Sequence, residues 1–148
     1  MVLTQELHVA TRGDGDVIDI TDKVGEEVAK SPVQDGIVIL FVPGSTAGLT
    51  TIEYESGAVH DFQEMFERIA SARLAYRHNL RWGDGNGHAH VRAALLGASL
   101  TVPFCRKRLL LGTWQQIVLV DFDVRLRERR IVVQIMGEGP APREGDVP

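Results

Sequence analysis

Strand-like patterns occupy both ends of this chain, whereas its longest helix-like patterns are confined to the middle. This segregation favours an α+β fold with an antiparallel sheet, because a parallel sheet needs regular alternation of strands and helices. With 148 residues, 44% of them hydrophobic, the chain is long enough to bury one core. We therefore predict a single compact α+β domain over residues 1–137, mainly an antiparallel sheet with helices inserted mid-chain. A loose tail over 138–148 is expected to follow it.

Four strands are predicted in the first half of the chain. Residues 3–11 alternate in part and residues 17–20 resume an apolar run after a Gly-Asp-Gly turn, which indicates a hairpin. Residues 37–42 are aliphatic and β-branched, which predicts a short buried central strand. The next strand is expected over 49–54, after a tight loop of small residues.

Three helices are predicted between and after these strands. Thr21 or Asp22 is expected to cap a short helix that ends at Ser31, because the residue before a proline avoids helical geometry. A second helix begins at Gly57, and its apolar residues follow the three- and four-residue spacing of one buried face. These residues are Val59, Phe62, Phe66, Ile69 and Ala70.

The third helix and the last strands complete the pattern. Val91, Ala94 and Leu95 mark an amphipathic helix that Gly97 caps at its C-terminus. The remainder is β-rich, and we expect its strands to form an antiparallel meander. These strands are predicted over 100–104, 109–111, 116–122 and 130–136.

Charge and targeting patterns exclude several classes of protein. The net charge is −4, which argues against nucleic acid or an anionic membrane as a partner. The basic residues of the last third lack interleaved aromatic residues, which indicates solvated turns or a phosphate-steering rim. These are Arg106, Lys107, Arg108, Arg125, Arg127, Arg129 and Arg130. No apolar leader or membrane-length apolar run is visible, so we expect a cytoplasmic protein.

Three of the five histidines surround a glycine-rich loop, and Asp84 lies between them. Because imidazoles are common metal ligands and titrate near neutral pH, His78, His88 and His90 suggest metal binding or acid-base chemistry. On a regular helix His88 and His90 would point about 200° apart. Both can reach one metal only if the segment is extended or His88 precedes the helical turns. Solvated loop histidines are the alternative.

Two further segments are candidates for binding anions. Gly83, Gly85 and Gly87 do not form a dinucleotide fingerprint, because no strand precedes them, but a phosphate could lie at the N-terminus of the following helix. The loop over 44–48 has flexible backbone and hydroxyl groups that could hold an anion, or it is a tight connection between paired strands. Glu53 or Glu55 could supply a carboxylate ligand or a general base; the alternative is that both are exposed carboxylates at the end of a strand.

Five segments in this order resemble the YjbQ-like family, and the resemblance covers nearly the whole chain. They read PGSTAGLTTIE at 43–53, RHN at 77–79, DGNGHAH at 84–90, LLGASLTVP at 95–103 and LGTWQQ at 111–116. The resemblance implies a compact α+β domain that assembles as a homotrimer, with a histidine-rich metal site near subunit boundaries. It also implies secondary thiamine-phosphate synthase activity, which joins a pyrimidine diphosphate to a thiazole phosphate and releases pyrophosphate.

The resemblance places His78, His90 and Glu53 on family motif positions, and Thr113, Trp114 and Gln115 on a motif of unclear chemical role. Many relatives carry histidine where Gly44 stands in this chain, whereas the position of His88 is often not histidine. We hypothesise that His88 supplies the missing imidazole. The predicted metal set is then His78, His88 and His90, and the cofactor is a divalent ion, zinc or magnesium.

The remaining roles follow from residue type. Glu53 or Asp84 would complete the metal shell, and an unligated histidine, with His78 as the candidate, would move a proton. The predicted phosphate-binding residues are Ser45, Thr46, Asn86 and Arg92. The expected partner is a phosphorylated small molecule. Two alternatives stay open: a metal-dependent phosphoester or ester hydrolase, and a non-catalytic trimer that binds a metal or small ligand.

Overall fold

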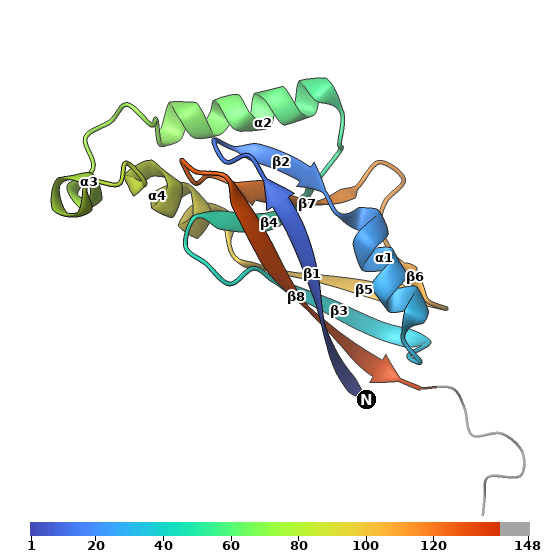
Figure 1. The fold of residues 1–148 in the computed structure, drawn as a ribbon. Helices are drawn as coiled ribbons and strands as arrows, with labels where there is room; N and C mark the ends of the chain where they lie inside the picture. Colours follow the sequence, from blue (N-terminus) through green and yellow to red (C-terminus); the bar gives the residue numbers. More distant parts are fainter. Residues whose placement is uncertain (140–148) are drawn as a thin grey trace, which may run out of the picture.

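Two antiparallel sheets form the framework of the computed structural model, which describes residues 1–139 (Figure 1). The five-stranded sheet has the order β1 (Val2–Thr11), β8 (Arg127–Glu138), β3 (Asp35–Phe41), β5 (Ser99–Cys105) and β6 (Arg108–Leu109). The three-stranded sheet has the order β2 (Asp16–Asp19), β7 (Gln116–Asp121) and β4 (Ala47–Ile52). The predicted α+β class is confirmed. Of the predicted tail, Glu138 still belongs to β8, and residues 140–148 lie outside the described part.

The predicted strand connections are partly wrong. β1 and β2 do not form a hairpin, because β1 pairs with β8 and β2 pairs with β7 in the other sheet. Gly13 makes this change of sheet possible: its φ is +73°, and a Cβ there would lie 2.3 Å from the Asp123 carbonyl oxygen. The predicted meander is also wrong beyond β5 and β6, since β8 lies between β1 and β3.

Four helices connect these strands in the described chain: α1 (Thr21–Lys30), α2 (Ser56–Ile69), α3 (Arg77–Trp82) and α4 (Gly87–Leu96). α1 ends at Ser31 as predicted, but neither Thr21 nor Asp22 caps it. Ile20 is its N-cap residue, and the Asp19 carboxylate accepts a hydrogen bond from the Thr21 N–H at 2.9 Å. α3 was not predicted. None of the helices in residues 1–139 has the length and apolar character of a membrane span.

The three-stranded sheet is buried on both faces. Ile117 and Leu119 of β7 pack with α1 and the inner face of the five-stranded sheet, whereas Val118 and Val120 pack with α2 and α4. β3 is central in its sheet but buried on one face only, because Ile37 and Phe41 are 37% and 45% exposed. The fully buried strand is therefore β7, and the prediction for residues 37–42 holds for the inward face alone.

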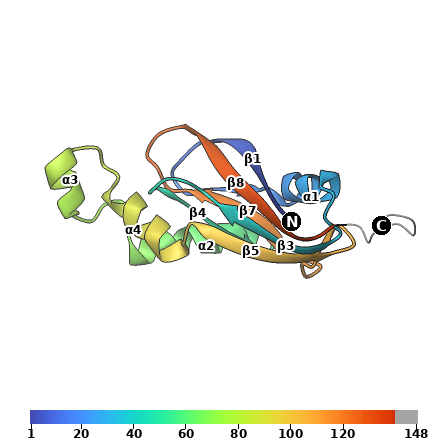
Figure 2. The ribbon, with the colours of Figure 1, turned by 90° about the horizontal axis from the view of Figure 1, so that it is seen from below.

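α4 buries a different face from the predicted one. Val91 and Leu95 are exposed, and the helix packs through Ala89 and Ala93. Small residues are needed here because α4 lies close to β4, where a Cβ on Gly48 would come within 2.9 Å of the Leu96 side chain. Gly97 is the C-cap residue as predicted, with φ +96°. α1 and α4 lie at opposite ends of the domain (Figure 2).

Candidate functional site

Three side chains from α3, the following loop and α4 meet at one end of the domain. They are His78, Asp84 and His90, and each offers a ligand atom within 4.8 Å of the other two. His78 Nε2 lies 3.1 Å from Asp84 Oδ1. The rings of His78 and His90 contact edge to face, with centroids 4.4 Å apart. We call these three residues the HDH triplet.

Two backbone groups orient the HDH triplet. The N–H of Asn86 donates to Asp84 Oδ1 at 3.0 Å, and this bond, followed by the one to His78, holds the pKa of Asp84 below its usual value. Asp84 is therefore an anion at neutral pH. His90 Nδ1 lies 2.9 Å from the Ser45 carbonyl oxygen. A carbonyl only accepts, so Nδ1 carries a proton, and the neutral form of this imidazole has its lone pair on Nε2.

This donor set fits zinc better than magnesium. Two imidazoles and one carboxylate are typical of zinc sites, whereas magnesium prefers oxygen ligands. The Ser45 carbonyl on the second nitrogen of His90 is the kind of outer partner that fixes a ligating histidine. The side chains of His78 and Asp84 are 32% and 34% exposed. A site with three protein ligands and access to solvent is typical of catalytic rather than structural zinc.

His88 does not join the HDH triplet. α4 already includes Gly87, so His88 and His90 both lie in its first turn and point in different directions. His88 is 4% exposed, and its Nδ1 is buried without a hydrogen-bond partner in the described chain. Burial, and then the charge of Arg92, lowers the pKa of His88. Asp84 thus occupies the place in the cluster that the sequence hypothesis gave to His88.

Glu53 lies at the other end of β4 from the HDH triplet. Ser45 precedes this strand and Glu53 follows it, and six strand residues span roughly 20 Å. Glu53 borders a separate hollow of about 330 Å³ together with Tyr54 and Trp114. Trp114 is 72% exposed. Within one chain, the family-motif residues therefore form two separate groups. His78 and His90 lie in the HDH triplet, and Glu53 and Trp114 lie at the other end of β4.

Most of the predicted phosphate-binding groups already have partners. The Thr46 hydroxyl donates to Asp123 at 2.9 Å, and Asn86 Oδ1 accepts from the Val124 N–H at 3.1 Å. Arg92 points away from the HDH triplet and donates to the Ala70 carbonyl and to Glu67. The N–H of Gly87 at the start of α4 donates to the Asn79 side chain.

Ser45 is the exception, because it is exposed beside the HDH triplet. It borders a hollow of about 240 Å³ whose wall is made of His90 and small residues. The other lining residues are Gly44, Ala47, Ala93, Ala94, Gly97 and Ala98. The hollow gives a small molecule access to the side of His90. A Cβ on Gly44, whose φ is +143°, would lie 3.2 Å from Arg129 Nη1.

A buried polar network behind the HDH triplet was not predicted. Asp121 is fully buried, Asp123 is 1% exposed and Arg129 is 9% exposed. Arg129 donates to both oxygens of Asp121, at 2.7 and 2.8 Å, and to the Thr46 hydroxyl. The prediction that Arg129 lies in a solvated turn is therefore wrong. The signal available in the sequence was the pair of aspartates at the end of an apolar strand.

The fold and the HDH triplet define an α+β domain with a histidine and carboxylate cluster at one end. The family model described as UPF0047 protein YjbQ-like matches residues 5–138. The chain belongs to this family.

Curated relatives and solved structures agree with this assignment. A UPF0047 protein of Archaeoglobus fulgidus is 37% identical over 131 residues, which cover 88% of this chain and 99% of that protein. The crystal structure of a YbjQ-like protein of unknown function from Sulfolobus solfataricus has a TM-score of 0.88 at 37% identity, covering 93% of this chain and 99% of that one. A hypothetical protein from Aeropyrum pernix has a TM-score of 0.85 at 32% identity, covering 92% and 99%.

Proposed function

We propose that this protein is a metal-dependent enzyme in which the HDH triplet holds a divalent cation, with zinc preferred over magnesium. The observation that carries the proposal is the grouping of His78, Asp84 and His90, each with a ligand atom within 4.8 Å of the other two, together with the Ser45 carbonyl, which accepts a hydrogen bond from His90 Nδ1 and fixes that ring. A cation held by these groups supplies a Lewis acid to an ester or phosphoester oxygen.

We propose hydrolysis of a small phosphoester or ester as the reaction. Support comes from the partial exposure of His78 and Asp84, which admits water and substrate. The hollow of small residues beside His90 has room for the alcohol part of a substrate, and the exposed Ser45 hydroxyl can donate to a phosphate oxygen. Since Asp84 accepts from the Asn86 N–H, it stays charged; His78 Nε2 donates to it in the absence of a cation, and a cation bound between the two would replace that proton.

Thiamine-phosphate synthase activity is the second candidate, and the family resemblance supports it. That reaction requires a site for a diphosphate and a second phosphate. Of the predicted donors, Thr46, Asn86 and Arg92 are engaged with protein partners, and Ser45 alone is exposed at the hollow. One chain therefore supports hydrolysis better than the synthase reaction.

We also propose that the protein assembles as a homotrimer through the outer face of its five-stranded sheet. The resemblance implies a trimer, and this face exposes apolar side chains that a monomer would leave in water. Ile37 and Phe41 of β3 lie on it, and Pro103 and Met136 are paired in register with Ile37. A second copy of the chain is the occupant that would cover them.

Zinc content and turnover measured on the same samples test the enzyme proposal. We expect the purified protein to bind about one zinc ion per chain and to hydrolyse members of a phosphoester and ester panel. His90→Ala and Asp84→Asn should each lower zinc affinity and turnover by more than tenfold. His60→Ala is the matched control, because His60 also lies beside carboxylates but is exposed on α2.

The outcomes distinguish a hydrolase, a thiamine-phosphate synthase and a non-catalytic trimer. Zinc binding without turnover on any substrate would favour the non-catalytic trimer. Formation of thiamine phosphate from the pyrimidine diphosphate and thiazole phosphate, with loss of that activity in His90→Ala, would favour the synthase. Failure of zinc, magnesium and other divalent ions to bind would overturn the metal proposal.

A further inference from the structure

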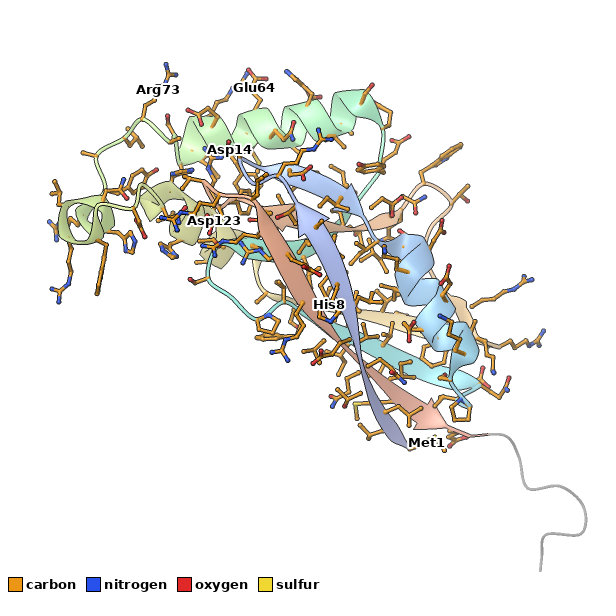
Figure 3. All side chains as sticks on the ribbon, in the orientation of Figure 1. Met1, His8, Asp14, Glu64, Arg73 and Asp123 are labelled. Atoms are coloured by element: carbon orange, nitrogen blue, oxygen red, sulfur yellow. The ribbon has the colours of Figure 1, made fainter. Side chains whose placement is uncertain are left out.

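Asp123, which follows β7, is the point where several segments around the HDH triplet are tied together. It lies at the same end of the domain as α4 and far from Met1 (Figure 3). Its carboxylate is surrounded by donors. Oδ2 accepts from Thr46 Oγ1 at 2.9 Å and Arg127 Nε at 3.2 Å, and Oδ1 accepts from the Arg125 N–H at 2.9 Å and Asn86 Nδ2 at 3.4 Å. Burial raises the pKa of Asp123, but these bonds outweigh it and hold the pKa below its usual value.

The first connection runs from Asp123 to His90. Asp123 accepts from the Thr46 hydroxyl, and Thr46 is 6% exposed, so its side chain has little freedom to move. The neighbouring residue, Ser45, presents its carbonyl oxygen to His90 Nδ1 at 2.9 Å. Asp123, together with Arg129, which donates to the same hydroxyl at 2.6 Å, therefore fixes the loop whose carbonyl orients the His90 ring.

The second connection runs from Asp123 to Asp84 and His78. The Asn86 side chain is clamped on the 123–124 segment, because its Nδ2 donates to Asp123 and its Oδ1 accepts from the Val124 N–H. The backbone N–H of Asn86 donates to Asp84 Oδ1, and Asp84 bonds to His78. The same buried aspartate thus holds the residue that orients the second half of the triplet.

We propose that Asp123 is the positioning residue of the HDH triplet: it aligns His90 through Thr46 and aligns Asp84 through Asn86 without being a ligand itself. That the triplet binds a metal ion is taken from the proposed function. Residues that orient ligands from behind typically contribute 10–100-fold to metal affinity. Asp123 connects to both halves of the triplet, so its loss should affect all three ligands together.

Zinc affinity measured by chelator competition is the first test. Asp123→Asn keeps the size of the side chain but turns an NH₂ group toward neighbours that all donate to the carboxylate in the unaltered protein. We expect its zinc affinity to fall about 10–100-fold. Thr46→Val should weaken binding in the same direction, whereas Thr46→Ser, which keeps the hydroxyl, should stay within about threefold of the unaltered protein.

A control variant and a second measurement separate the positioning role of Asp123 from a general loss of stability. Val28→Ala removes buried volume at the α1 end of the domain and has no connection to the triplet, so it should destabilise the fold and leave zinc affinity unchanged. The ¹⁵N shifts of the His90 ring report its tautomer in the metal-free protein. Asp123→Asn and Thr46→Val should convert a single Nδ1–H tautomer into a mixture, whereas Val28→Ala should not.

The failures are distinguishable. If His90→Ala abolishes zinc binding while Asp123→Asn and Thr46→Val bind normally, the positioning role is wrong and the proposed function stands. If the unaltered protein binds no metal, the proposed function fails, and an unchanged His90 tautomer in both variants would overturn the positioning role as well. If Asp123→Asn does not fold, normal zinc affinity and an unchanged His90 tautomer in Thr46→Val overturn the positioning role, because the first connection runs through the Thr46 hydroxyl, which Asp123 and Arg129 share.

Discussion

At the α1 end of the domain, Val24 and Val28 are fully buried against other aliphatic side chains, whereas at the α4 end the buried groups include Asp121, Asp123 and Arg129. The α1 end is stabilised by apolar area, which has no preferred direction. The α4 end depends on hydrogen bonds between charged groups, each of which needs its own partner at a fixed angle. The candidate site lies at the α4 end, so directional bonding is found where ligand atoms must be aimed.

Asp121→Asn should produce the largest loss of stability, about 3–5 kcal/mol. Asp121 accepts two hydrogen bonds from Arg129, so the substitution leaves a buried guanidinium with Asp123 as its nearest carboxylate, 3.9 Å away. The measurement is the free energy of unfolding from urea titrations. Adding Arg129→Met should recover part of the loss, because the uncompensated charge is then gone. If the two losses simply add, the buried charge is not the cause.

Val28→Ala at the α1 end should cost less, about 2 kcal/mol, from lost burial plus a small cavity. The loss should be independent of pH and salt, since no charged group is involved. Urea titrations at two salt concentrations check this. A strong salt dependence in this variant would contradict the distinction between the two ends.

The α1 end could be predicted from the sequence more fully than the α4 end. The proline after Ser31 correctly predicted where α1 ends, and short apolar, β-branched runs correctly predicted β3 and β7 as strands, because these signals are local in the sequence. The pairing of β1 with β8 could not be predicted, since it depends on contacts between segments more than a hundred residues apart. That information is not carried by local pattern.

The candidate site was also predicted only in part, because local sequence shows which residue types are present but not which side chains meet. His78 and His90 carry a compositional signal, and Asp84 lies between them in the glycine-rich loop. The start of α4 decides which imidazoles converge, and the sequence left open whether His88 precedes the helical turns. With α4 beginning at Gly87, His88 turns inward and Asp84 meets the histidines instead. The only signal for Asp123 was its place in a pair of aspartates at the end of an apolar strand, and this did not reveal its burial, because a buried aspartate and an exposed one look the same in sequence.

The pH dependence of stability tests the difference between the two ends of the domain through Glu67. It lies near the α4 end, where hydrogen bonds from Ser71, from the Ala72 N–H and from Arg92 lower its pKa from 4.5 to about 2. A carboxylate whose pKa is lowered by folding contributes stability above its unfolded pKa, and this contribution is lost as pH falls through the folded value. Glu67→Gln should therefore be less stable than the unaltered protein at pH 6, and the gap should narrow between pH 4.5 and 2. A gap that stays constant down to pH 2 would contradict the assignment.

Phe41→Lys should have the smallest effect on the fold, within about 0.5 kcal/mol, because the side chain is already 45% exposed. Its effect should appear in assembly instead, since Phe41 lies on the outer sheet face proposed as the subunit contact. We expect light scattering to give the mass of a trimer for the unaltered protein and of a monomer for Phe41→Lys. Val91→Lys is the matched control, because Val91 is 49% exposed on α4 and lies outside that face. A trimer that survives Phe41→Lys but dissociates with Val91→Lys would move the subunit contact to the α4 end, next to the HDH triplet.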